Sequence, residues 1–216
     1  MIIDFADFTT GGTVVNPPLE DVVLTDKEVY PYTADTIVRS VSYSRTIEVG
    51  RFYGYCLPFD IYITEDMYNS VEQYYPNPVF KYNPNNGHFL PILTDLKILP
   101  TGTLIKANSP ILFRSRNGVT EYTIHGDNRK GYVELKAGTG KPNIETSKPY
   151  VINNSEGKWY FYPVQEKILS GEVGADIICY ISSNGKIGWT DLPNTSINSY
   201  RWILTHDNLI NYNSNN

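Results

Sequence analysis

The chain has 216 residues and a net charge of −5, and it contains 18 Tyr, 16 Gly and 14 Pro. A chain of this length can bury a core without disulfides or a structural metal, and its composition favours strands and turns over long helices. Lysine and arginine are scattered without a basic stripe, which argues against nucleic-acid binding, because that function needs clustered cations.

The first 36 residues predict an extended arm ahead of a single domain over residues 37–216. Gly11-Gly12, Pro17-Pro18 and Pro31 separate short apolar patches there. Proline fixes φ and removes a hydrogen-bond donor, so the segment favours edge-strand or polyproline conformation. We expect the arm to dock on a neighbouring subunit; the alternatives are a solvent-exposed leader and an edge strand added to its own domain. The expected assembly contacts are Val14, Val15, Pro17, Pro18, Leu19, Val22, Val23 and Leu24.

Strand patterns begin after the arm. Val41, Tyr43 and Ile47 share one parity and alternate with serine and threonine, which is typical of a half-buried strand. Further predicted strands, in chain order, are 52–59, 61–64, 89–92, 103–107, 111–115, 121–125, 132–136, 150–153, 159–164, 177–182 and 199–205.

One segment of the chain favours a helix. Thr64 is a suitable N-cap, acidic residues follow it, and Pro76 would end the helix after about three turns. The apolar residues with helical spacing are Met67, Val71 and Tyr74.

Three Asn-Gly pairs predict tight turns between strands, because asparagine and glycine accept positive φ. They are Asn86-Gly87, Asn117-Gly118 and Asn184-Gly185, of which the last is the clearest hairpin. Together these elements predict an all-β fold, a two-layer antiparallel sandwich of jelly-roll type with one short helix near 65–75.

The sequence shows no linear motif for chemistry, and we expect no catalytic residue, no cofactor and no metal site. The histidines do not have metal-ligand spacing, and Gly138-Thr139-Gly140-Lys141 is followed at once by Pro142, which disfavours a phosphate-binding loop. Cys56 and Cys179 lie in apolar runs, so buried thiols are favoured over a disulfide. A glycan-cleaving enzyme would need paired carboxylates in one cleft, which sequence alone does not reveal.

Aromatic residues provide a possible contact surface, since tyrosine and tryptophan are common where a protein meets another protein or a sugar ring. The alternative is that most of them belong to the core. The candidate contact residues are Tyr74, Tyr75, Trp159, Tyr160 and Trp189.

Two stretches resemble known families. Asn16-Pro17-Pro18-Leu19-Glu20-Asp21, followed by Val22-Val23-Leu24-Thr25, resembles the leader of phage tail proteins. Over about residues 41–205 the chain resembles a β-sandwich module of Bacteroidetes surface proteins. That likeness rests on Tyr43-Ser44-Arg45-Thr46, Tyr55-Cys56-Leu57-Pro58-Phe59-Asp60, residues 104–113 and residues 199–204.

The resemblances imply an accessory or adhesive role without catalytic residues. With the tail-like leader, they lead us to expect a virion structural or attachment protein of a phage that infects Bacteroidetes: a collar spike, fibre base, decoration or tail-associated protein. We expect assembly in the host cytoplasm, other virion proteins as partners in an oligomer, a possible host-surface glycan, and no membrane insertion, since no apolar stretch is long enough to span a bilayer. The alternative is a carbohydrate-binding or adhesive module of a bacterial cell surface.

Overall fold

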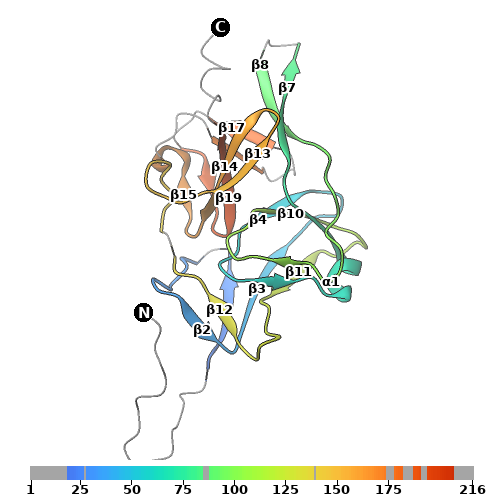
Figure 1. Ribbon diagram of the computed structural model, residues 1–216, viewed down its shortest axis with the longest axis vertical. Helices are drawn as coiled ribbons and strands as arrows, with labels where there is room; N and C mark the ends of the chain where they lie inside the picture. The colour runs from blue at the N-terminus through green and yellow to red at the C-terminus, as the bar shows by residue number, and fades with distance from the viewer. Residues whose placement is uncertain are drawn as a thin grey trace, which may run out of the picture.

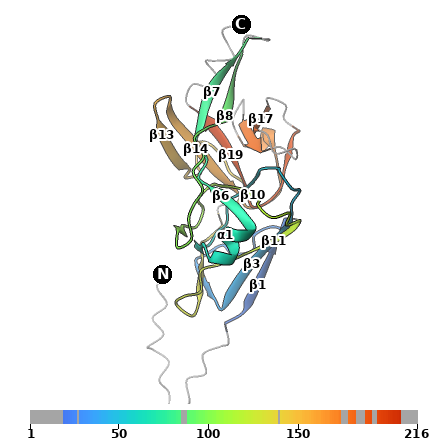
Figure 2. The ribbon, with the colours of Figure 1, turned by 90° about the vertical axis from the view of Figure 1, so that its right-hand side faces the viewer.

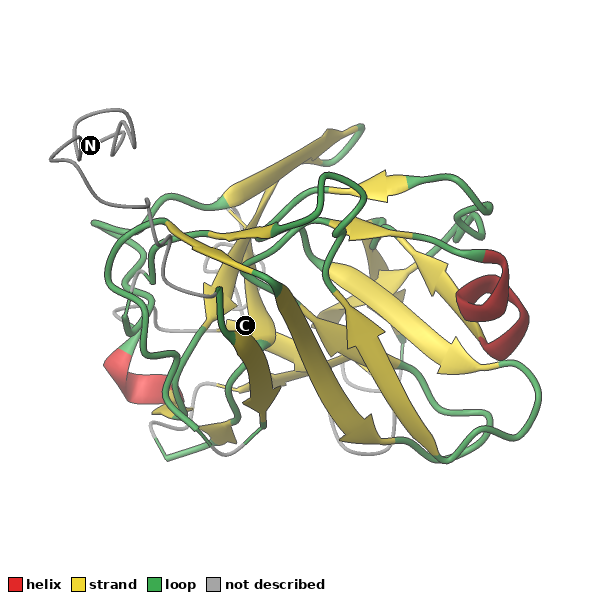
Figure 3. Ribbon diagram, turned by 90° about the horizontal axis from the view of Figure 1, so that it is seen from below, coloured by secondary structure: helices red, strands yellow, loops and turns green. Residues whose placement is uncertain are grey.

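The computed structural model describes residues 19–26, 28–84, 88–138, 140–173, 178–181, 187–190 and 194–206. Strands are the main regular element of these residues, and the helical turns lie at the edges of the molecule (Figure 3). The predicted all-β class is therefore confirmed.

The first sheet forms one end of the molecule (Figure 1). Its strands are β1 (Asp21–Thr25), β3 (Ser40–Thr46) and β11 (Glu121–His125), in the order β1-β3-β11. β1 pairs with β3 in parallel, whereas β11 pairs with β3 antiparallel. Two short ladders accompany this sheet: β2 (Thr36–Val38) with β12 (Val133–Leu135), and β5 (Ile61–Tyr62) with β9 (Leu104–Ile105).

A second sheet lies in the middle of the molecule and is buried on both faces. It consists of β4 (Tyr53–Tyr55), β10 (Ile111–Ser115) and β6 (Val71–Tyr74), in the order β4-β10-β6. Along β10, Phe113 packs into a first core shared with the first sheet, while its neighbour Leu112 packs into a second core. Because side chains alternate along a strand, this one sheet serves two cores.

The third sheet covers the second core and is antiparallel throughout. Its strands are β13 (Tyr150–Asn154), β14 (Gly157–Val164), β19 (Arg201–His206), β16 (Ile178–Ile181) and β17 (Ile187–Thr190), in that spatial order. A third core on its other face includes Tyr162 and Ile203. This core is covered by β15 (Ile168–Leu169), β18 (Ser196–Ile197) and the 3-10 turn η2 (Ser170–Glu172).

The hairpin of β7 (Pro78–Asn83) and β8 (His88–Leu93) extends from the end of the molecule opposite the first sheet (Figure 2). The architecture is thus sandwich-like, but the layers are three sheets rather than two. The parallel pairing of β1 with β3 also departs from the antiparallel pattern that the sequence predicts.

The predicted helix is shorter than expected. α1 spans Glu65–Ser70, and Thr64 is its N-cap, accepting a hydrogen bond from the Met67 N–H at 3.3 Å. The sequence pattern places Val71–Tyr74 in the helix, but this segment is strand β6, which pairs with β10. Pairing with the middle sheet buries Val71 in the first core, and this long-range contact outweighs the local helical pattern.

The Asn-Gly pairs have different outcomes. Asn117-Gly118 does not join a hairpin, since β10 and β11 belong to different sheets and only the glycine has positive φ. Asn86-Gly87 and Asn184-Gly185 lie outside the described residues. The strands on either side of each pair are antiparallel neighbours, as hairpins require.

The expected boundary at residue 36 is wrong, because the domain includes earlier residues. β1 is part of the first sheet, and Leu24 and Tyr30 are buried in the first core at 3% and 6% exposure. For this part of the predicted arm, the alternative of an edge strand on its own domain is the observed one. Residues 1–18 lie outside the described part.

Both cysteines are free thiols buried in the second core, as the sequence favours. Burial disfavours the thiolate, so it raises the pKa of the Cys56 thiol and raises the pKa of Cys179 to about 12. Neither thiol is therefore poised as a nucleophile at neutral pH.

Candidate functional site

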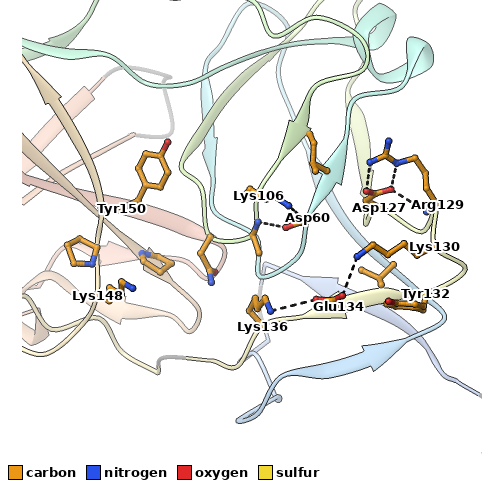
Figure 4. A pocket seen from close by; sticks show the side chains of 16 residues that line it. Asp60, Lys106, Asp127, Arg129, Lys130, Tyr132, Glu134, Lys136, Lys148 and Tyr150 are labelled. Atoms are coloured by element: carbon orange, nitrogen blue, oxygen red, sulfur yellow. Dashed lines mark hydrogen bonds and ion pairs between the residues drawn. The ribbon is translucent and has the colours of Figure 1, made fainter. Parts of the chain in front are cut away.

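One candidate site is a charged cleft of about 700 Å³ (Figure 4). It is built from loops beside strands β5, β9, β11 and β12 and from the segment that leads into β13. Its lining side chains come from Asp60 just before β5, from β9 and the residues after it (104–108), from the connection between β11 and β12, from β12 and Lys136, from 148–150, and from Pro163 of β14.

A glycine determines how the connection from β11 to β12 leaves the first sheet. A Cβ at Gly126 would lie 2.5 Å from a methyl carbon of Val41 and 2.8 Å from one of Val133. Only glycine therefore fits between these buried side chains. The next residue, Asp127, donates its backbone N–H to the carbonyl of Asp60 at 2.8 Å, which holds two acidic residues of the cleft together.

Both of these carboxylates are held by cations. Lys106 Nζ lies 2.8 Å from Asp60 Oδ2, and the Ala107 N–H donates to Asp60 Oδ1 at 2.8 Å. Arg129 binds Asp127 in a bidentate pair with distances of 2.7 and 2.8 Å. These hydrogen bonds from Arg129 hold the pKa of the Asp127 carboxyl below its ordinary value.

The Arg129 guanidinium is also fixed from its other side, since it lies 3.7 Å from the centroid of the Tyr62 ring. A cation over an aromatic face gains electrostatic attraction, and the bidentate pair fixes its orientation. Arg129 and Asp127 therefore form a rigid edge of the cleft.

Lysines supply the remaining positive charge. Lys136 Nζ pairs at 2.9 Å with Asp35, a residue that does not line the cleft, and lies 3.8 Å from Glu134. Lys130 Nζ lies 3.6 Å from Glu134. Lys148 is exposed and has no ion-pair partner among the described residues. Five cations and three carboxylates thus line a cleft in a chain whose net charge is −5.

Two tyrosines border this charged surface. Tyr150 is 37% exposed, and Tyr132 is half-buried. Figure 4 shows Tyr150 on one side and Tyr132 on the other, with the charged side chains of Lys106 and Asp60 between them. The arrangement offers aromatic surface, ion pairs and lysine side chains to one ligand.

Those residues predicted for assembly that the structure describes do not line this cleft. Val14, Val15, Pro17 and Pro18 lie outside the described residues. Leu19 and Val23 are exposed at 39% and 64%, Val22 is half-buried, and Leu24 belongs to the core. The pattern follows from β1, which alternates its side chains between solvent and the first core.

The predicted aromatic contact surface is wrong for the residues whose side chains are most deeply buried. Trp159 is fully buried and Tyr74 is 4% exposed, both in the second core. Tyr75 and Tyr160 are half-buried and pack against the first and third cores. The Trp189 side chain lies outside the described part; its backbone pairs with Cys179.

The sequence does not single out the cleft. Asp60 and Asp127 each follow a predicted strand, which is a signal for polar groups at strand ends. Which strand ends meet depends on the sheet order, and the charges come from segments as far apart as Asp60 and Lys148.

Two further observations concern metal ligands and membrane-spanning helices. Among the described residues, no group of three or more His, Cys, Asp or Glu side chains is placed to hold a metal ion. In the same part of the chain, no helix has the length and apolar character to cross a membrane.

No family model, curated protein or solved structure matches the chain.

Proposed function

We propose that the protein is a non-catalytic attachment protein that binds a carbohydrate in the charged cleft. The observation that carries this proposal is the combination of Tyr132 and Tyr150 with fixed ion pairs between them. Tyrosine rings pack against the apolar faces of sugars, and the charged groups accept or donate hydrogen bonds to sugar hydroxyls. The unpaired Lys148 favours a carbohydrate that carries anionic groups.

The state of the carboxylates supports binding rather than cleavage. A glycosidase needs one carboxylic acid whose pKa is raised so that it can protonate the leaving oxygen. Here Arg129 lowers the pKa of Asp127, and Lys106 pairs with Asp60. Glu134 lies near two lysines. Each of the three lining carboxylates thus lies near a cation, and the hydrogen bonds from Arg129 favour the ionised form of Asp127.

The proposed place of this binding activity is a virion. The leader resemblance of residues 16–25 supports that setting, with other virion proteins as partners. If mass spectrometry of purified virions failed to detect the chain, the virion assignment would be refuted, while the carbohydrate proposal would stand for a cell-surface module.

A glycan array tests the carbohydrate proposal. Wild-type protein should bind an acidic polysaccharide, and Tyr150→Ala and Lys148→Ala should each weaken binding about tenfold. Tyr82→Ala is the matched control, because Tyr82 is 52% exposed on β7, outside the cleft lining. Equal binding by Tyr150→Ala and wild type would contradict the cleft assignment. Release of shortened product would instead show a glycan-cleaving enzyme.

A second candidate function is assembly through β1. Among the described residues β1 pairs only with β3, so the other edge of β1 has no partner strand there. Val23, in β1, is 64% exposed. An unpaired edge strand can add a strand from another chain. Val23→Lys should prevent such pairing and shift an oligomer toward monomer in light scattering, whereas an unchanged mass would exclude this edge as the interface.

A further inference from the structure

A second, smaller pocket lies where the first, middle and third sheets meet. Its volume is about 330 Å³, and β3, β4, β16 and β19 all contribute to it. The pocket contains two arginines, together with aromatic, apolar and hydroxyl-bearing side chains. Its lining residues are Arg45, Tyr53, Gly54, Tyr180, Ile181, Thr195, Ser196, Ile197, Asn198, Arg201 and Trp202.

One of the arginines has a full set of partners. Arg201 is 12% exposed, and its Nη2 lies 2.5 Å from Asp26 Oδ2. Its Nη1 donates to the Tyr43 hydroxyl at 2.7 Å, and Tyr43 in turn donates to Asp26. The charge of Arg201 is therefore compensated within the fold.

The other arginine is not compensated. Arg45 donates one hydrogen bond to the Gly54 carbonyl at 3.1 Å and lies 4.5 Å from the Tyr53 ring centroid. It has no ion-pair partner among the described residues. None of its nitrogen atoms is buried without a partner, so the N–H groups that make no hydrogen bond within the fold remain accessible at the pocket.

The pocket thus concentrates positive charge in a partly dehydrated place. Of the two guanidinium groups, Arg201 has the carboxylate of Asp26 as its partner, whereas Arg45 has none among the described residues. Burial and the neighbouring Arg201 lower the pKa of Arg45 to about 10, so the group is still a cation at neutral pH. A partly buried cation without a counter-ion is costly, and an incoming oxyanion would supply the missing negative charge.

We propose that this pocket binds the carboxylate of an acidic sugar. The planar fork of Arg45 matches a carboxylate in two parallel hydrogen bonds. The exposed side chains of Ser196 and Asn198 supply polar partners for sugar hydroxyls, and Tyr180 supplies an aromatic wall. The volume is near the lower end of ligand pockets, which suits one sugar unit. This site is separate from the charged cleft and does not depend on it.

Calorimetric titration of the full chain tests the assignment with glucuronate as the probe. Glucuronate should bind, whereas glucose, which lacks the carboxylate, should bind at least about tenfold more weakly. Arg45→Gln should reduce the glucuronate affinity about tenfold or more, because it removes charge-assisted hydrogen bonds. Arg39→Gln is the matched control, because this arginine is exposed and outside the pocket lining, and it should leave the affinity unchanged.

Arg45→Lys covers the case in which Arg45→Gln fails to fold. Lysine keeps the charge but loses the fork, so glucuronate affinity should fall several-fold while the thermal midpoint stays near that of wild type. A purely structural role for Arg45 would lower the midpoint and leave the affinity of the folded protein unchanged, which would overturn the proposal.

Competing ligands decide the chemical class. If inorganic sulfate or N-acetylaspartate bound as tightly as glucuronate, the pocket would be a general anion or acidic-peptide site and the sugar assignment would be overturned. Equal affinity for glucose and glucuronate would overturn the role of the carboxylate. Tyr150→Ala, in the charged cleft, should leave the glucuronate affinity and its loss in Arg45→Gln unchanged. The two proposed binding sites can therefore be refuted independently of one another.

Discussion

Replacing Trp159 with alanine should destabilise the protein rather than remove a contact surface. The indole is fully buried in the second core, with ring centroids of Phe80 at 4.7 Å and His206 at 4.4 Å. Truncating a buried tryptophan costs about 3–5 kcal/mol, because the transfer energy is lost and a cavity remains. That is a large share of the ~5–15 kcal/mol that holds a typical domain together, and it should lower the melting temperature by about 10 °C.

Urea denaturation followed by circular dichroism measures this change in the free energy of unfolding. Trp159→Phe should cost less than Trp159→Ala, since it keeps most of the ring contact with Phe80. Tyr150→Ala is the surface control and should change the free energy by less than about 1 kcal/mol, because Tyr150 is 37% exposed. If Trp159→Ala kept its stability yet lost binding to a ligand or partner, the assignment of this ring to the core would be refuted.

Three further predictions concern local packing and charge. Thr64→Ala should cost about 1 kcal/mol by removing the N-cap of α1, while Thr64→Ser should be nearly neutral in the same thermal melts; equal losses would exclude a capping role. Gly54→Ala should lower the free energy of unfolding in urea denaturation by about 1–3 kcal/mol, because the new Cβ would lie 2.9 Å from Trp202 Nε1. An unchanged free energy would mean that the indole can shift freely. Arg114 holds the pKa of Glu72 below its ordinary value of 4.5, so the pair stabilises the fold above that pH, and this stabilisation is lost as the pH falls through the lowered pKa of the folded state. The urea concentration at the unfolding midpoint should therefore fall less between pH 6 and pH 3 in Glu72→Gln than in wild type. An equal fall in both proteins would contradict the pairing.

Strands whose burial alternates are predictable from the sequence. β10 and β11 have the same bounds as the predicted strands 111–115 and 121–125. In β11, Tyr122 and Ile124 face the first core while the three residues that alternate with them are more exposed, which is the period-2 pattern visible in the sequence. Local alternation carries this information, so no long-range contact has to be known.

The exposure of aromatic residues is less predictable, because it depends on how many sheets stack. Along β14 the side chains of Trp159 and Phe161 enter the second core, while Tyr162 enters the third. A strand with a core on each face shows no polar side, so its aromatic run cannot be divided into buried and exposed members by parity. The same limit applies to the charged cleft and to Arg45, whose surroundings come from segments distant in the chain.

The N-terminal segment shows why an arm and an edge strand cannot be separated by composition. Its apolar patches are partly used within the domain, since Leu24 and Tyr30 are in the first core and the Tyr30 N–H donates to the Gln165 carbonyl at 3.0 Å. Asp26 is the carboxylate that compensates Arg201, so residues near it also stabilise β19 at the far end of the chain. Removing residues 1–36 would therefore leave a buried guanidinium without a counter-ion and would disrupt the core, whatever the segment does in assembly. Removing only residues 1–18 keeps the Tyr30–Gln165 hydrogen bond and the Asp26–Arg201 ion pair. This shorter truncation therefore tests the role of the apolar patch at Val14 and Val15 in assembly without removing these two contacts of the fold.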